Sequence, residues 1–145
     1  MTSDGTPWRP IVHIEDSGTA ISSCMTVPVE AISGQVFNVG ANAENYRIRE
    51  IAQIVKAVFP DCELTFGPSG GDNRSYRVSF DKIDAMLPGF RCRWTVREGA
   101  RQLRQVFERI QMRPDDFEAP AYTRLRGLKQ LIATGQIDEN YFWTA

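Results

Sequence analysis

The sequence has little of what metal sites and disulfide frameworks require. It contains one histidine, His13, and three cysteines, Cys24, Cys62 and Cys92, which are far apart and form no Cys-x-x-Cys pair. This spacing fits neither a structural zinc site nor a set of disulfides, and free cysteines suit a reducing compartment. We therefore expect a cytoplasmic protein that binds no metal.

Long apolar runs and an excess of one charge are also missing. No stretch approaches the roughly 18 apolar residues of a membrane span, and the first ten residues, "MTSDGTPWRP", do not resemble a signal peptide. The formal net charge is −1, so no overall field attracts the chain to nucleic acid or to an anionic membrane. We expect neither nucleic acid nor a membrane as a partner.

Motifs for cofactor binding and catalysis are absent as well. The glycines of "GPSGGD" do not form Gly-x-Gly-x-x-Gly, there is no phosphate-binding loop of the Gly-x-x-x-x-Gly-Lys-(Ser/Thr) type, and no tyrosine is followed four residues later by lysine. The sequence gives no support for catalysis, or for cofactor binding, by this chain alone.

What is present is an ordinary globular composition with clear helix signals. Hydrophobic residues make up 42% and charged residues 24% of the 145 residues. The spacing of apolar residues predicts an amphipathic helix over residues 47–59 and another over 122–132. Gly135 is the expected stop signal after the second helix. Thr95 and Glu98 form a capping box at the start of a third helix, and Ser79 is the expected N-cap of a short helix over 80–87.

The strand signals are shorter. Residues 11–14, 36–39 and 62–66 each read as a strand, the first two as buried ones, and residues 76–78 as a short extended piece. The segment after residue 16 is a poor helix, because Gly18 and several hydroxyl residues disfavour one. The order of elements predicts a mixed α/β or α+β fold, with residues 1–112 as the main region and 113–145 as a helical extension of the same domain.

Three arginines are candidates for binding an anion. Arg74 and Arg77 follow a glycine-rich loop, and Arg9 stands between Trp8 and Pro10 at the start of an expected strand. A guanidinium can place two parallel hydrogen bonds on phosphate oxygens, which lysine cannot. The alternative is that these arginines are solvated surface charges or pair with a neighbouring aspartate.

Three segments, in order, resemble the C-terminal half of the extended short-chain dehydrogenase/reductases, the NAD-dependent sugar-nucleotide epimerases and dehydratases. The first is "RPIVHIED" at residues 9–16, and the second is "VFNVG" at 36–40 followed by the helix "YRIREIAQIV". The third is "DNRSYRVSFDKI" at 72–83, continued by "GFRCRWTVREGARQL". The resemblance covers roughly residues 4–112.

The resemblance implies roles for particular residues. Arg9 and Arg74 would contact the diphosphate of a nucleotide sugar from two sides, whereas Arg77 is expected to remain a solvated surface charge. The other motif residues are given structural roles: His13 as a hydrogen-bonded core residue, Asp16 as a helix cap, and Asn38 on the strand that closes the family's cofactor-domain sheet. NAD(P) is implied for the family, but its binding residues belong to a half that this sequence does not match.

Three hypotheses follow from this pattern. The first is a truncated family member, a substrate-binding lobe with an edge strand and helix of a Rossmann-type sheet and no turnover of its own. The second is half of a split enzyme, complemented by a separate cofactor-binding chain. A homo-oligomer is a separate possible assembly. The third is a non-catalytic interaction module in which the arginines bind nothing small.

Overall fold

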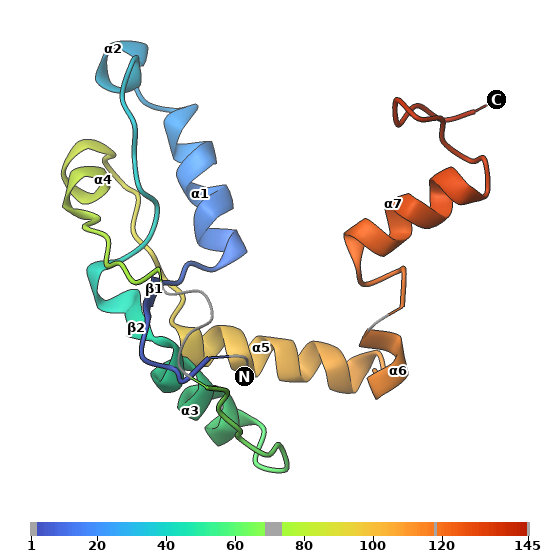
Figure 1. Cartoon of the computed structure of the whole chain (residues 1–145). Helices are drawn as coiled ribbons and strands as arrows, with labels where there is room; N and C mark the ends of the chain where they lie inside the picture. Colours follow the sequence, from blue (N-terminus) through green and yellow to red (C-terminus); the bar gives the residue numbers. More distant parts are fainter. Residues whose placement is uncertain (1–2, 69–73, 118, 145) are drawn as a thin grey trace. The chain divides into compact units, whose positions relative to one another are not determined.

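The computed structural model describes residues 3–68, 74–117 and 119–144. Contacts within the chain divide it into two compact units, Met1–Arg104 and Gln105–Ala145. Helix α5, Val96–Arg109, contains this division. The remaining bounds are β1 Trp8–Pro10, α1 Ile14–Cys24, α2 Val29–Ile32, the 3-10 helix Asn42–Glu44, β2 Asn45–Arg47, α3 Ile48–Val58, α4 Asp81–Met86, α6 Pro114–Phe117 and α7 Arg124–Ala133 (Figure 1).

The first unit is built on a small antiparallel sheet. Strands β1 and β2 pair with Trp8 opposite Arg47 and Arg9 opposite Tyr46, and α3 follows directly from β2 (Figure 1). The amide of Ile48 at the start of α3 donates to the Pro7 carbonyl at 3.0 Å, which ties the helix to the chain before β1. The described residues thus form a mixed fold of helices and strands, as predicted from the order of elements, and most of its regular structure is helical.

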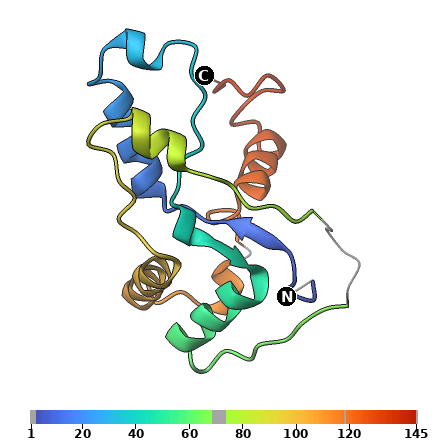
Figure 2. The same cartoon turned by 90° about the vertical axis from the view of Figure 1, so that its left-hand side faces the viewer.

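The hydrophobic core lies between α1 and α4, which Figure 2 shows against each other. Ala20 of α1 packs with Ile83 of α4 and with Phe80, Leu87 and Phe90 on either side of that helix, all at most 3% exposed. Gly40 is required beside this cluster, because a Cβ atom there would lie 2.5 Å from Cε1 of Phe80.

The predicted helices over 47–59, 80–87 and 122–132 and the helix that begins at the Thr95–Glu98 box are confirmed, but the N-cap of α4 is Phe80 and not Ser79. Helices α3 and α7 begin and end within two residues of the expected bounds, and α4 occupies residues 81–86 of the expected 80–87. At α5 the Thr95 amide donates to Glu98 Oε2 at 2.8 Å, and the Glu98 amide donates to the Thr95 hydroxyl at 3.3 Å. These two bonds form the expected capping box.

The strand predictions are wrong. Residues 11–13 have no regular structure and Ile14 begins α1, while residues 36–39 and 62–66 lie outside the two strands. Residues 76–78, expected only as an extended piece, are not a strand either, and the amides of Tyr76 and Val78 bond to Trp8 of β1 and to the Asn45 side chain of β2. Ile11, Val12 and Val36, expected in buried strands, are 37%, 42% and 80% exposed. A short apolar run becomes a strand only where a neighbouring strand accepts its backbone hydrogen bonds, and local sequence does not supply that neighbour.

The prediction of a poor helix after residue 16 is also wrong. Helix α1 has eleven residues, with its N-cap at His13. Thr19 and Ser17 donate their hydroxyls to carbonyls four residues earlier, Glu15 and His13, so these side chains do not leave the helix for other partners. Ala20 and Asp16 are both 3% exposed, and their burial outweighs the low intrinsic helix propensity.

Candidate anion-binding site

An extended segment, residues 74–78, lies along β1 and positions the candidate arginines. The Trp8 amide donates to the Ser75 hydroxyl at 3.0 Å, and the Tyr76 amide donates to the Trp8 carbonyl at 3.4 Å. Further along, the Asn45 side chain donates to the Val78 carbonyl at 3.0 Å and accepts from the Val78 amide at 2.9 Å. This segment therefore follows the ribbon of β1 and β2 without being a strand itself.

Arg9 and Arg74, the two predicted binding residues, are brought together by this arrangement. Arg9 Nη1 donates to the carbonyl of Trp8 at 2.8 Å and to the carbonyl of Arg74. The Arg9 guanidinium also lies over the ring of Tyr76, 5.2 Å from its centroid. Arg9 is partly buried and Arg74 is exposed. Residues 69–73, which hold most of the glycine-rich loop, lie outside the described residues.

A second group of side chains surrounds Trp8. The guanidinium of Arg77 lies 4.8 Å from the centre of the indole, and that of Arg47 lies 5.4 Å from it. Arg77 is exposed, as a surface charge would be, and its guanidinium also contacts Trp8. Sequence reasoning missed Arg47 altogether, because its contact with Trp8 depends on the cross-strand register.

A groove of about 430 Å³ adjoins Trp8 and is lined in part by Tyr46, Glu50 and Arg97. Glu50 accepts a 2.6 Å hydrogen bond from the backbone amide of Arg47. Burial, together with the nearby carboxylate of Glu44, raises the pKa of Tyr46. The Tyr46 hydroxyl therefore stays protonated and donates to Glu44, with both oxygens at 3.1 Å.

His13 is placed as the N-cap of α1 and is held through both ring nitrogens. Its Nδ1 accepts from the Glu15 amide at 3.2 Å, so Nε2 carries the proton and donates to Gln102 Oε1 at 2.8 Å. The ring stacks on Trp94 with centroids 4.0 Å apart. His13 is therefore hydrogen-bonded, but at a helix start and not on a strand.

Asp16 lies in the first turn of α1 and does not cap that helix. Its Oδ1 accepts from the Arg93 amide at 3.0 Å and its Oδ2 accepts from the Trp94 amide at 3.1 Å. Asp16 thus ties the chain before α5 to α1, a role that the cap prediction did not include. Asn38 is exposed, and residues 35–39 around it form no strand in the structure.

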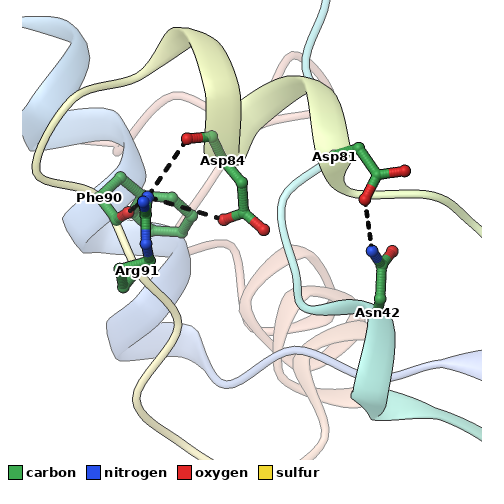
Figure 3. Close-up of polar contacts among 5 residues, drawn as sticks. All are labelled: Asn42, Asp81, Asp84, Phe90 and Arg91. Carbon is green, nitrogen blue, oxygen red and sulfur yellow. Dashed lines mark hydrogen bonds and ion pairs between the residues drawn. The ribbon is translucent and has the colours of Figure 1, made fainter.

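One asparagine that sequence reasoning did not single out, Asn42, holds the 3-10 helix to the start of α4. Asn42 donates to Asp81 Oδ1 at 2.6 Å (Figure 3) and accepts from the Phe80 amide at 2.9 Å. Hydrogen bonds from Ser79 and Asn42 lower the pKa of Asp81. At the other end of α4, Arg91 donates to the carbonyls of Asp84 and Phe90 and lies 3.9 Å from Asp84 Oδ1 (Figure 3).

Among the described residues, no three His, Cys, Asp or Glu side chains are grouped so that they could hold a metal ion. No helix in that part of the chain has both the length and the apolar character to cross a membrane. The sheet of the described residues has two strands, β1 and β2, which run antiparallel.

Comparison with known proteins adds no family assignment. No protein-family model matches the chain, and no curated protein is significantly similar to it.

Proposed function

We propose that the chain binds a nucleoside diphosphate sugar through Arg9 and Arg74, as the substrate-binding part of an NAD-dependent epimerase or dehydratase. The observation that carries the proposal is the hydrogen bond from Arg9 Nη1 to the Arg74 carbonyl, which joins segments 65 residues apart in sequence. These are the two arginines to which the resemblance to the family assigns the diphosphate.

The geometry supports an anion between the two side chains. In an extended segment, residues two apart point to the same side, so Arg74 is on the side of Tyr76, whose ring lies under Arg9. The Tyr76 ring and the carbonyl bonds restrict the rotamers of Arg9, which lowers the entropic cost of binding. A diphosphate with oxygens on two phosphorus atoms suits two separate guanidiniums.

The test is isothermal titration calorimetry with UDP-glucose and a panel of other nucleotide sugars. We expect weak binding by the wild type. Arg74→Ala should weaken it about ten- to a hundredfold, since a charge-assisted hydrogen bond contributes roughly 1.5–3 kcal/mol. Arg74→Lys should cost nearly as much, because the ammonium keeps the charge and loses the two-pronged geometry. Arg9→Ala should have a similar effect, and the double variant should be less than additive.

Arg93→Ala is the matched control, because Arg93 is an exposed arginine of the same unit that belongs neither to β1 and β2 nor to residues 74–78. Absence of binding by the wild type at millimolar nucleotide sugar would refute the proposal. An Arg93→Ala variant as impaired as Arg74→Ala would refute the assignment of the two arginines.

The second hypothesis, a chain complemented by a separate cofactor-binding protein, is supported by apolar exposure. Ile14 and Ile21 on α1 and Met25 at its C-cap are 78%, 68% and 82% exposed. Mixing the chain with such a protein and measuring epimerase or dehydratase turnover with NAD tests this hypothesis. Turnover by neither the chain alone nor the mixture would leave the binding proposal as the whole function.

A further inference from the structure

We infer that Trp8, Arg47 and Arg77 form a second anion site, on the face of the ribbon opposite to Arg9, which takes the phosphate groups of a phosphorylated small molecule. Nothing in the proposed nucleotide-sugar clamp requires this site. The observation behind it is that two guanidiniums from different segments lie within 4.8 and 5.4 Å of one indole centre.

The two faces follow from strand geometry. Trp8 and Arg9 are neighbours in β1, and successive side chains in a strand point to opposite faces. Arg9 is in contact with Tyr76, while Trp8 is in contact with Arg77, the next residue of the extended segment. Arg47 lies directly opposite Trp8 in the sheet and joins the Trp8 face. The aromatic and cationic residues are thus sorted into two separate groups.

The Trp8 group carries positive charge that no acidic side chain neutralises directly. Within the described residues, neither Arg47 nor Arg77 forms an ion pair with a carboxylate. The carboxylate of Glu50 lines the same groove as Trp8, where it accepts from the backbone amide of Arg47 and not from a guanidinium. Two like charges held against one ring repel each other, and a bound anion relieves that repulsion.

Stacking also leaves the hydrogen-bonding groups of both arginines usable. A guanidinium over an aromatic ring uses its face for that contact, while its N–H groups lie in its plane and reach sideways. Trp8 presents its own ring to arginines and not to a nucleobase, so the ligand feature recognised here is the phosphate. The first two amides of α3 donate to the carbonyls of Pro7 and Gly5, so the guanidiniums and not the helix N-terminus supply the donors.

The experiment is a titration of the full chain with pyrophosphate, followed by NMR on arginine Nε–H and tryptophan Nε1–H signals. It is done in an Arg74→Ala background, which removes the proposed nucleotide-sugar clamp. We expect shifts at Arg47, Arg77 and Trp8, and an affinity that falls about ten- to a hundredfold when Arg77→Ala is added. Arg77→Lys should lower the pyrophosphate affinity by a similar factor. Arg47→Ala is an independent second variant and should also lower it. Adding Arg93→Ala should change nothing.

Unchanged pyrophosphate affinity in both Arg77→Ala and Arg47→Ala would overturn the inference, as would shifts confined to Arg9. The outcome is separable from that of the clamp. A loss of UDP-glucose binding without a loss of pyrophosphate binding concerns the clamp of Arg9 and Arg74. A loss of pyrophosphate binding when Arg77 or Arg47 is replaced in the Arg74→Ala background concerns the Trp8 site.

Discussion

Single side chains with buried polar atoms hold the first unit together at places that carry no binding role. Asp16 is 3% exposed, and its two oxygens accept the amides of Arg93 and Trp94, 77 and 78 residues further along the chain. Buried N–H groups that lose their acceptor cost stability, because they cannot return to water.

Asp16→Ala should therefore lower the free energy of unfolding by roughly 2–4 kcal/mol, since two backbone amides lose their bonds to one buried carboxylate at once. Asp16→Asn keeps one acceptor oxygen and should lower the free energy of unfolding by less than Asp16→Ala. Chemical denaturation followed by far-UV circular dichroism measures both. Asp61→Asn, at an exposed carboxylate, is the control and should change stability little. An Asp16→Ala variant as stable as this control would contradict the assignment.

The Cys92 thiol provides a residue-scale prediction about pH. Burial, with the nearby negative charges of Asp16 and Asp84, raises the pKa of Cys92 to about 11. The thiolate is the reactive form, so at about pH 8 iodoacetamide should label Cys92 more slowly than the exposed Cys62. Because the folded pKa is the higher one, stability should fall as pH rises from the ordinary value of 9.0 toward 11. Peptide mass spectrometry that finds Cys92 labelled first would contradict this prediction.

At the scale of the element, the helices with signals in their own sequence were predictable and the extended segments were not. The stripe of α3 and the Thr95–Glu98 box are local patterns, and both are confirmed. Helix α1 was missed because what stabilises it is distant: Asp16 binds residues near α5, and Ala20 packs on Ile83 of α4. Which extended run pairs with which is likewise decided by partners far along the chain.

The same limit applies to the candidate site. Arg9 and Arg74 stand out because their surroundings resemble a known pattern, but their contact through the Arg74 carbonyl is a tertiary fact. Arg47 could not have been found from the sequence, since its neighbour Trp8 is 39 positions away and reached only through the register of β1 and β2.

The capping box of α5 gives a prediction for one helix. Thr95→Ala should lower the free energy of unfolding by about 1 kcal/mol at neutral pH, because the Glu98 amide loses its acceptor. Thr123→Ala is the matched control, as Thr123 is the N-cap of α7 but makes no side-chain capping bond. If Thr123→Ala lowered the free energy of unfolding as much as Thr95→Ala, the effect would come from replacing threonine at an N-cap position in general and not from the hydrogen bond to Glu98.

The pH dependence of this cap has a defined sign. Hydrogen bonds from the Thr95 amide and hydroxyl lower the pKa of Glu98 from its ordinary 4.5. The contribution of Glu98 is therefore present above pH 4.5 and is lost as the pH falls through the lower, folded value. The stability difference between Glu98→Gln and the wild type should shrink over that acidic range in denaturation curves.

At the scale of the whole molecule, apolar surface is the dominant unexplained feature. Among the described residues, large apolar side chains are more often exposed than fully buried. Buried and exposed side chains lie on opposite sides of α1. Asp16 and Ala20 are buried, whereas Ile14, Ile21 and the C-cap residue Met25 form an exposed stripe. A stripe of this kind favours association, because covering it removes apolar area from water.

The chain in isolation should therefore self-associate as its concentration rises, which sedimentation velocity over a dilution series measures. Ile21→Lys should reduce the association without lowering the unfolding free energy, because Ile21 is 68% exposed and contributes little to the core. Ser22→Lys is the matched control, since it adds the same charge to an exposed residue about 100° further around the helix. A chain that stays monomeric at every concentration would contradict the role of the stripe in association. Equal effects of the two lysine variants would show that net charge, and not the apolar stripe of α1, governs association.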